Sequence, residues 1–512
     1  MALDSTTSAV LSDLKHDDAL HESSNSALDG NIARSLAEAR AAQPAWAASP
    51  LRHRLKVLRR LRHRIAARPD DFIDAVSHPQ RRNGAETLAA ELLPLADACR
   101  WLEDQAATVL APRTLSRRAR PLWLAGVRVT ESRDPFGVVL VISTWNYPLF
   151  LPGVQIAQAL AAGNAVLLKP GRDGTAAAEA LRDALFACGL DRRLLTVLPE
   201  AVDAARAAIG HGVDKVVLTG AAETGRKVLS QLADTLTPAD MELSGCDAVF
   251  VRGDADLDLV VKALAFATLF NGGATCIAPR RVFVHRSLAA DVEARLTPRF
   301  AEMPPVAVED DIAARLDELL SEAAEHGARL LTGGVERSGG NARIRPMLLG
   351  DVPSNAELLK ADILAPVLSL ITVDSDEQAI RLNSQCPYAL GATVFGRSEP
   401  ASDLAAKLDA GCVVVNDVLV PTADPRVAFG GRRQSGFGVT RGAAGLLAMT
   451  QPKTVIEQTS NWRPHLEPPT ETDESLMRNY LAAAHGRNWR DRLRAAFRCA
   501  RDAYKMRRSH GD

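Results

Sequence analysis

Three side chains of the sequence have the types and surroundings needed for covalent chemistry on a carbonyl group. Cys276 follows the glycine-rich turn 271–274, so its thiol and its backbone N–H would be accessible. Glu242 stands between apolar residues, where partial desolvation raises the pKa of a carboxyl group toward the range of a general base. Asn146 precedes a helical pattern and can donate two side-chain hydrogen bonds to an oxyanion. These residues would supply a nucleophile, a base and an oxyanion donor.

Taken one at a time, each of these residues also has an ordinary structural explanation. An Asn before a helix is more often a cap, a Glu at a strand edge usually faces water, and a lone Cys is usually a small buried hydrophobe. A fourth segment, the glycine loop 428–438, could line a substrate entrance but says little by itself. The argument for catalysis depends on reading the four segments together.

Other catalytic motifs are incomplete in this sequence. The run from Gly220 to Gly225 opens a helix after a strand, but Arg226 and Lys227 stand where a P-loop needs Lys and then Ser or Thr. A glycine turn at a helix N-terminus can still bind phosphate through backbone N–H groups. The histidines have no metal-site spacing, either with each other or with cysteine. We therefore expect neither NTP hydrolysis nor a metal site, while a Cys/His hydrolase stays open although no histidine lies in a companion motif.

The composition excludes several classes of protein. The 512 residues include 61 Lys and Arg against 62 Asp and Glu, so the net charge is −1 and a globally basic nucleic-acid binder is excluded. Seven cysteines without C-x-x-C spacing fit a reducing compartment. The first residues have no secretory signal pattern, and the longest apolar region, 148–168, is broken by polar residues and glycine. We expect a cytoplasmic protein with no membrane span.

The elements that would position these residues alternate between strand and helix. This rhythm from residue 138 to residue 236 is typical of a doubly wound α/β domain with a parallel sheet. The expected strands are 138–143, 165–168, 194–198 and 215–218, and the expected helices are 95–109, 151–162, 175–188, 203–209 and 222–236. A second α/β stretch runs from 248 to about 420, and residues 121–133 suggest a hairpin around Ala125-Gly126.

In their order and separation, the segments resemble the NAD(P)-dependent aldehyde dehydrogenase superfamily. The motifs that carry the resemblance are Asn146 in Thr-Trp-Asn-Tyr-Pro, Glu242 in Met-Glu-Leu-Ser-Gly, Cys276 in Asn-Gly-Gly-Ala-Thr-Cys, and the loop 428–438. The similarity covers about residues 31–460. It implies a Rossmann-like cofactor domain, an α/β catalytic domain and a small β element through which members pair into dimers or tetramers.

The resemblance assigns a role to each of the three side chains. Cys276 is the implied nucleophile, Glu242 the general base and Asn146 the oxyanion-hole side chain. The implied reaction oxidises a small-molecule aldehyde to a carboxylic acid through a thiohemiacetal and a thioester, and water activated by Glu242 hydrolyses the thioester. Two alternatives stay open: a CoA-acylating relative, and a catalytically silent binding protein of the same fold.

The resemblance also implies which residues bind the cofactor, NAD or NADP. They are Lys169 at the adenosine ribose, Gly220 and Gly225 at the pyrophosphate with Trp145 beside them, and Asp362 at the nicotinamide ribose. Arg172 occupies a position where NAD-preferring members commonly carry Glu, so it would attract a 2′-phosphate and favour tolerance of NADP.

These patterns divide the chain into five parts. They are a mobile N-terminal extension (1–30), a cofactor domain (31–116 and 136–244), a catalytic domain (245–443), oligomerisation strands (117–135 and 450–462) and a C-terminal extension (463–512). In the last part, apolar and basic residues over 486–508 recur at helical spacing. They predict a basic amphipathic helix that binds weakly to a membrane surface or a partner protein, or that packs on the protein's own surface.

Overall fold

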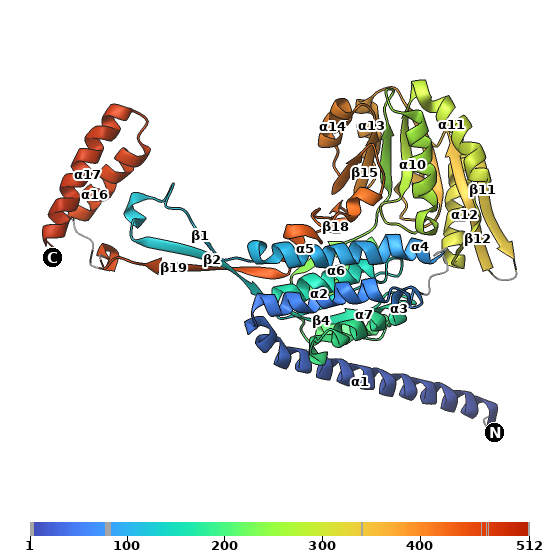
Figure 1. Cartoon of the computed structure of the whole chain (residues 1–512), viewed down its shortest axis with the longest axis horizontal. Coiled ribbons are helices and arrows are strands. Elements are labelled where there is room, and N and C mark those ends of the chain that lie inside the picture. The colour runs from blue at the N-terminus through green and yellow to red at the C-terminus, as the bar shows by residue number, and fades with distance from the viewer. Residues whose placement is uncertain are drawn as a thin grey trace. The chain divides into compact units, whose positions relative to one another are not determined.

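The computed structural model describes residues 5–76, 83–338, 341–461, 463–466, 468 and 471–509. The chain forms two compact units. The larger unit contains residues 1–111 and 133–453, and the smaller unit contains residues 112–132 and 454–512. Figure 1 labels the helices and strands of both units.

A six-stranded sheet forms the centre of the first lobe of the larger unit. Its strand order is β18-β7-β6-β3-β4-β5. The strands are β3 (Val138–Ile142), β4 (Ala165–Lys169), β5 (Leu195–Val197), β6 (Lys215–Thr219), β7 (Ala239–Glu242) and β18 (Gly436–Phe437). All are parallel except β18, which runs antiparallel to β7. Every residue of β3 is buried, as a parallel strand covered on both faces requires. The carboxyl ends of β3, β4, β6 and β7 therefore meet at one edge.

Helices cover both faces of this sheet. They are α1 (Ser5–Ala48), α2 (Leu51–Ala67), α3 (Asp70–Ile73), α4 (Gly84–Thr87), α5 (Leu93–Val109), α6 (Phe150–Ala162), α7 (Thr175–Ala187), α8 (Val202–Gly210), α9 (Ala222–Leu232) and α15 (Gly442–Ala448). Helices α6 and α7 connect β3 to β4 and β4 to β5. Helix α8 then connects β5 back to β6, on the other side of β3, and α9 connects β6 to β7. Because such crossovers are right-handed, the two pairs lie on opposite faces. Every residue of helix α6 is buried, including its two glutamines, Gln155 and Gln158, so the helix forms the centre of the core.

An eight-stranded sheet forms the second lobe. Its order is β10-β12-β13-β9-β8-β15-β16, with β11 paired to β12. The strands are β8 (Asp247–Val251), β9 (Pro279–His285), β10 (Val306–Val308), β11 (Arg329–Ser338), β12 (Asn341–Gly350), β13 (Val367–Val373), β15 (Gly391–Phe395) and β16 (Cys412–Val415). Its helices are α10 (Leu257–Leu269), α11 (Arg286–Ala301), α12 (Asp310–Glu325), α13 (Asp376–Asn383) and α14 (Ser398–Lys407). A separate ladder joins β14 (Tyr388–Ala389) to β17 (Arg432–Arg433). Two apolar clusters pack around the larger sheet and form its core.

The smaller unit contains a three-stranded sheet and a helical hairpin. The sheet has the order β1-β2-β19 and consists of β1 (Arg113–Thr114), β2 (Val127–Pro135) and β19 (Thr450–Gln458). The hairpin consists of α16 (Glu471–His485) and α17 (Trp489–Ser509). Asp502 of α17 accepts hydrogen bonds from Ser475 and Asn479 of α16, both at 2.8 Å, which fixes the two helices together.

Most predicted elements are confirmed, and two expectations need correction. Helix α1 begins at Ser5, inside the segment 1–30 that we expected to be a mobile extension, because no proline interrupts its helix-compatible residues before Pro44. The hairpin expected around Ala125-Gly126 is absent. Residues 122–124 form a 3-10 turn instead, and the Gly126 carbonyl accepts a hydrogen bond from the Thr459 N–H at 2.7 Å. No helix of the described chain is long and apolar enough to cross a membrane.

Candidate active site

Glu242 is the last residue of β7, and its carboxylate is buried. Thr440 donates a hydrogen bond from Oγ1 to Glu242 Oε2 at 3.1 Å, whereas Oε1 has no hydrogen-bond partner among the described residues. Burial raises the pKa of this carboxyl group, while the charge of Arg441 and the Thr440 hydrogen bond oppose the rise. A carboxylate with an unpaired oxygen and a raised pKa is suited to accept a proton.

The glycine loop 428–438 packs against the strand that carries Glu242. Its strand β18 places Gly436 opposite Glu242. Gly436 has a φ of 98°, and a Cβ there would lie 1.9 Å from the carbonyl oxygen of Met241, so only glycine fits. The loop thus supports β7, and its residue Phe429 also lines a cavity in the second lobe.

Three consecutive left-handed residues build the turn before Cys276. Residues 271–273 have φ values of 52°, 60° and 78°. A Cβ at Gly273 would lie 2.5 Å from the backbone nitrogen of Pro366, so the turn requires glycine at this point. Gly245, three residues after the base, packs against the same turn, and a Cβ there would lie 2.3 Å from the Cys276 carbonyl oxygen. The segments that carry Glu242 and Cys276 are therefore in direct contact.

The Cys276 thiol needs a base to lose its proton. Burial raises its pKa, the carboxylates of Glu242 and Asp247 raise it further, and Arg441 opposes them. The side chain itself lies in a turn and is partly exposed. A thiol with a raised pKa is a weak nucleophile until an adjacent base takes its proton, and Glu242 is the carboxylate that most affects it.

Hydrogen bonds join Asn146 to the turn before Cys276. Its Nδ2 donates to the carbonyl oxygen of Ala274 at 2.7 Å, and its Oδ1 accepts from the Thr144 hydroxyl at 2.7 Å. Asn271 in turn donates from Nδ2 to the Asn146 carbonyl oxygen at 3.0 Å. Asn146 follows the carboxyl end of β3. These contacts hold its side-chain amide against Ala274, two residues before Cys276.

The adjacent edge of the sheet has features that suit a dinucleotide. A Cβ at Gly171 would lie 2.3 Å from the carbonyl carbon of Thr144, so the loops after β3 and β4 meet without side chains between them. A Cβ at Gly225 would lie 2.7 Å from Leu243, so the first turn of α9 packs closely beside the base segment. Lys169 ends β4, half-buried, and burial lowers the pKa of its ammonium. Close backbone, a helix N-terminus and a cation are the parts of a phosphate-binding site.

Two of the other predicted cofactor residues have partners that the sequence did not indicate. Burial raises the pKa of Asp362, opposed by a hydrogen bond from Ser244 and the charge of Arg280. Ser244 Oγ also accepts a hydrogen bond from the backbone N–H of Ala222 at 2.9 Å, so this N–H at the start of α9 is already satisfied. Arg172 forms an ion pair with Glu309, the residue before α12. The last two predicted cofactor residues are Gly220, which directly follows β6, and Trp145, which lies between Thr144 and Asn146.

A comparison with known families decides what this chain is. The model of the "Aldehyde dehydrogenase family" matches residues 15–455. The chain belongs to the aldehyde dehydrogenase family.

Individual aldehyde dehydrogenases are similar over most of their length. A protein of Mycolicibacterium smegmatis, named "Putative succinate-semialdehyde dehydrogenase" with NADP(+) in its name, is 31% identical over 83% of this chain and 84% of its own. The 4,4'-diapolycopene aldehyde oxidase of Methylomonas sp is 27% identical over 85% of this chain and 84% of its own. A solved Mycobacterium tuberculosis aldehyde dehydrogenase complexed with NAD+ has a TM-score of 0.78 at 26% identity, covering 85% of this chain and 92% of that one.

The structure of this aldehyde dehydrogenase also places residues at the site that the sequence did not single out. Glu91 is fully buried and accepts hydrogen bonds from the backbone N–H groups of Leu149 and Phe150, at 3.1 and 2.6 Å, where α6 begins. Glu86 accepts from the backbone N–H of Asn271 at 2.8 Å. In the sequence, the one feature that could have indicated Glu86 and Glu91 is their position in an otherwise apolar helical segment. Among the described residues, no group of His, Cys, Asp or Glu side chains could hold a metal ion.

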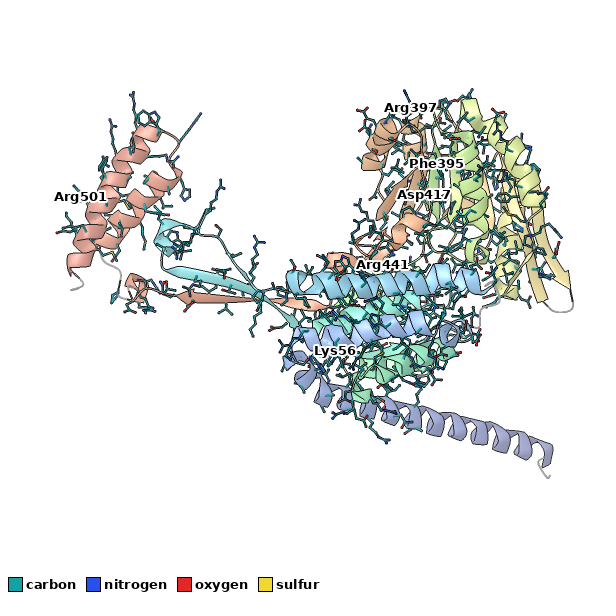
Figure 2. The ribbon with its side chains drawn as sticks, in the orientation of Figure 1. Lys56, Phe395, Arg397, Asp417, Arg441 and Arg501 are labelled. Atoms are coloured by element: carbon teal, nitrogen blue, oxygen red, sulfur yellow. The ribbon has the colours of Figure 1, made fainter. Side chains whose placement is uncertain are left out.

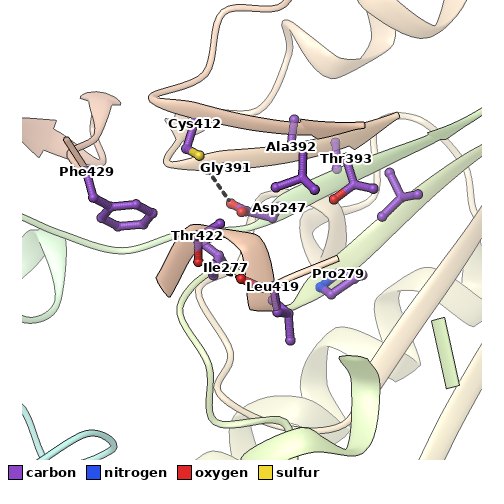
Figure 3. Close-up of a pocket in the computed structure, with 13 residues that line it drawn as sticks. Asp247, Ile277, Pro279, Gly391, Ala392, Thr393, Cys412, Leu419, Thr422 and Phe429 are labelled. Carbon is purple, nitrogen blue, oxygen red and sulfur yellow. Dashed lines mark hydrogen bonds between the residues drawn. The ribbon is translucent and has the colours of Figure 1, made fainter. Parts of the chain in front are cut away.

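The second lobe contains a small cavity (Figure 3). Its lining includes Ile277, which follows Cys276, together with Thr422, Phe429 and Cys412. Asp247 also lines it and accepts a hydrogen bond from the backbone N–H of Gly391 at 3.1 Å. Burial raises the pKa of Asp247 well above its usual range, which favours its neutral form.

Proposed function

We propose that this chain oxidises an aldehyde to a carboxylic acid with NAD or NADP as the hydride acceptor. The observation that carries the proposal is the meeting of three groups from different elements. The Asn146 amide is hydrogen-bonded to the turn of Cys276, and the Glu242 segment packs on that same turn. A nucleophile, a base and an oxyanion donor on contacting segments are the parts that acyl chemistry on a cysteine needs.

The first proposed step is addition of the thiol to the aldehyde. Glu242 accepts the proton of the Cys276 thiol, and the sulfur forms a bond to the carbonyl carbon, whose π electrons move to oxygen. The Asn146 amide and the backbone N–H of Cys276 stabilise this oxyanion. A bound NAD or NADP would supply the acceptor for the hydride that leaves the same carbon. The carbon is then a thioester on Cys276, oxidised by two electrons.

The second proposed step is hydrolysis of the thioester. Glu242, once it has passed its first proton to solvent, removes a proton from water, and the resulting hydroxide oxygen attacks the thioester carbon. The carbon–sulfur bond breaks, and the Cys276 sulfur takes up the proton again. The unpaired Oε1 of Glu242 supports this role, because it is a buried acceptor that water can satisfy.

The two alternative functions, acylation of CoA and silent binding, would make different demands on Cys276, Glu242 and Asn146. A CoA-acylating enzyme would transfer the acyl group to a thiol and would not need a base for water, whereas Glu242 is buried beside Cys276 with a raised pKa. A silent binding protein would have no chemical use for all three side chains. Free carboxylate formed without CoA supports oxidation, and acyl-CoA formed only when CoA is added contradicts it.

For the cofactor, we propose the residues at the edge of the first sheet. They are Lys169 and Arg172 at the adenosine ribose, Trp145, Gly220 and Gly225 at the pyrophosphate, and Asp362 at the nicotinamide ribose. The glycine contacts near β3 and α9 support this arrangement. The Arg172–Glu309 ion pair leaves the preference between NAD and NADP open, because a 2′-phosphate would compete with Glu309.

The proposed division of the chain keeps the two lobes as cofactor and catalytic domains. The cofactor domain would comprise 31–116 and 136–244, and the catalytic domain 245–443. We propose that the strands of 117–135 and 450–462 pair copies of the chain into a dimer or tetramer in the cytoplasm. Ile456 on β19 is 68% exposed, which supports a role for this strand in contacts between copies.

For α17, we propose weak binding to an anionic membrane surface. The seam of α17 at Ala495, Asp502 and Met506 is buried, whereas Trp489 and Phe497 are 65% and 78% exposed. Eight Lys and Arg residues against two Asp lie along the same helix, which favours a negatively charged partner with an apolar layer. Phe497→Ser in the full chain should reduce co-sedimentation with anionic vesicles, with Tyr504 and the fold left intact. Equal binding of the variant, or no binding by the wild type, contradicts the proposal.

The activity itself is tested by assaying purified protein with an aldehyde panel and both cofactors. Cofactor reduction with one carboxylate formed per hydride transferred supports the proposal. A preparation that binds cofactor but reduces none of it with any aldehyde contradicts it.

A further inference from the structure

Cys246 and Cys386 are two buried thiols in contact with each other, and neither takes part in the proposed oxidation. Cys246 is 1% exposed and Cys386 is 2% exposed, and their side chains are hydrogen-bonded to each other. The carbonyl oxygen of Leu359, 3.5 Å from the Cys246 sulfur, is a second acceptor for the same thiol proton. A lone buried cysteine behaves as a small hydrophobe. Two free thiols in hydrogen-bond contact have instead the arrangement from which a disulfide forms.

Neighbouring strands of the larger sheet bring these two thiols together. Cys246 directly precedes β8, and Cys386 lies shortly before β15, which ends at Phe395 (Figure 2). The two strands are parallel neighbours, so the segments that lead into them start at the same edge of the sheet. The backbone N–H of Gly391 donates to Asp247 Oδ1 at 3.1 Å and joins the two segments directly (Figure 3). The contact between the thiols is therefore fixed by the fold of the second lobe.

A second small cavity gives one of the two thiols a path from the surface. It shares no residue with the cavity in Figure 3. Its lining includes the buried residues Arg281 and Cys386 together with the exposed residues Ser354 and Gln385. Because buried and exposed residues line the same space, the cavity extends inward from the surface to Cys386. A molecule as small as hydrogen peroxide suits such a path.

The surroundings make Cys386 the more reactive of the two thiols. The hydrogen bond from Cys246 lowers the pKa of the Cys386 thiol, burial opposes this effect, and the charge of Arg281 lowers the pKa further. The same hydrogen bond and burial raise the pKa of Cys246. Arg281 is held beside the pair, because its Nε and Nη2 donate to the Cys246 carbonyl oxygen at 2.9 and 2.7 Å. The thiolate is the form of cysteine that attacks an oxidant, so Cys386 reacts first.

We propose that Cys246 and Cys386 form a reversible disulfide when the protein meets hydrogen peroxide. The Cys386 sulfur attacks one peroxide oxygen, so that a sulfur–oxygen bond forms and the oxygen–oxygen bond breaks. The leaving hydroxide combines with the Cys386 proton as water. The Cys246 sulfur then attacks the sulfenic acid, the sulfur–sulfur bond forms, and a second hydroxide leaves with the Cys246 proton. Two thiols and one peroxide thus give one disulfide and two waters, a two-electron oxidation that a dithiol reverses.

Formation of the disulfide pulls on the segment that supports the catalytic turn. A disulfide bond is about 2.05 Å long, much shorter than a hydrogen bond between two thiols, so the two segments must approach each other. Ser435 lies between them, since its hydroxyl donates to the Ser244 carbonyl oxygen at 2.6 Å and accepts from the Ala389 N–H at 2.9 Å. The adjacent Gly245 packs on the Cys276 carbonyl oxygen without room for a Cβ. We therefore expect the disulfide to slow aldehyde oxidation. This consequence rests on the proposed function, whereas the disulfide itself does not.

The test is peptide mass spectrometry of the full chain after exposure to hydrogen peroxide. Free thiols are alkylated in denaturant, and the protein is digested without reductant. The expected product is a Cys246–Cys386 cross-link, lighter by two hydrogen atoms than the two free peptides, that dithiothreitol removes. Cys99 and Cys188, whose pKa values burial raises, are the internal control and should stay reduced. Free thiols at both positions of the pair, or a cross-link to another cysteine in its place, overturn the proposal.

Two variants test the order of the two steps. Cys246→Ser leaves Cys386 without a partner thiol, so peroxide should produce a sulfenic acid at Cys386 that a dimedone probe traps. Cys386→Ser should leave Cys246 unmodified. Cys188→Ser is the matched control and should form the same cross-link as wild type. Dimedone on Cys246 in the Cys386→Ser protein, with none on Cys386 in the Cys246→Ser protein, contradicts the assigned order.

Activity gives a second readout of the same event. Peroxide-treated wild type should lose most of its aldehyde oxidation and recover it with dithiothreitol. Cys386→Ser should keep its activity through the same treatment, because the raised pKa of Cys276 leaves that thiol protonated and slow to react. An equal loss in both proteins, or a disulfide that leaves activity unchanged, overturns the effect on catalysis. If the untreated enzyme oxidises no aldehyde, the proposed function fails, while the cross-link still decides whether the two thiols form a redox pair.

Discussion

The hydrogen bond from Thr440 to Glu242 should set the pH at which the enzyme begins to turn over. The Thr440 hydroxyl donates this hydrogen bond to the Glu242 carboxylate at 3.1 Å. The bond lowers the pKa of the carboxyl group, which burial raises. A hydrogen bond to a charged group contributes about 1.5–3 kcal/mol, and about 1.4 kcal/mol corresponds to one pKa unit. Thr440→Val should therefore raise the pKa of Glu242 by about one to two units.

The sign of the effect on activity follows from the role of the base. Glu242 accepts protons only when ionised, so the rate rises as pH increases through its pKa. Raising that pKa moves the acidic limb of the kcat profile to higher pH. At a pH above the limb, the variant should regain most of its activity.

The assay is steady-state kcat as a function of pH for wild type, Thr440→Val and Thr440→Ser. The serine variant keeps the hydroxyl and should resemble wild type. A Thr440→Val profile whose acidic limb does not move would refute the reasoning, provided that melting temperature and cofactor binding are unchanged. The threonine hydroxyl also contacts the Phe429 carbonyl at 3.3 Å, so the melting temperature must be measured as well.

Two further predictions test packing and cofactor choice. Gly245→Ala should lower the melting temperature and the activity, because its Cβ would lie 2.3 Å from the Cys276 carbonyl oxygen, and overpacking costs about 1–3 kcal/mol. Gly210→Ala, with nothing near its Cβ, should lower neither, and equal effects would contradict the packing argument. Glu309→Gln should raise the NADP to NAD ratio of kcat/KM up to about fivefold by releasing Arg172, since an exposed ion pair is worth about 1 kcal/mol or less. An unchanged ratio would show that Arg172 does not meet the 2′-phosphate.

The parallel sheet of the first lobe could be predicted because local sequence patterns indicate its strands. Residues 138–142 and 165–169 are continuous apolar runs that end at polar or glycine residues, and the structure has strands at both. The meeting of Asn146, Glu242 and Cys276 was predicted only through the family resemblance. Their residues lie far apart in the sequence, and no local pattern specifies a contact between them.

The parts of the site that could not be predicted depend on long-range packing. The Arg172–Glu309 pair joins the two lobes, and nothing near either residue in the sequence indicates the other. Arg441 in a polar glycine loop reads as an ordinary surface cation until the structure buries it between two rings. The hairpin expected at 121–133 is absent because residues 122–124 form a 3-10 turn, while β2 pairs with β1 and with the distant β19, and no local signal could indicate the pairing with β19.

The most direct test of the central claim is to look for the acyl group on Cys276. Glu242→Gln is mixed with aldehyde and excess cofactor, quenched in acid within one turnover and analysed by peptide mass spectrometry. The account predicts one acyl adduct on the Cys276 peptide, formed more slowly than in wild type because Gln cannot accept the thiol proton, together with about one reduced cofactor per active site, and slow to release carboxylate. Cys276→Ala should give neither product. An adduct on another residue, or steady-state turnover in Glu242→Gln equal to wild type, would contradict the account.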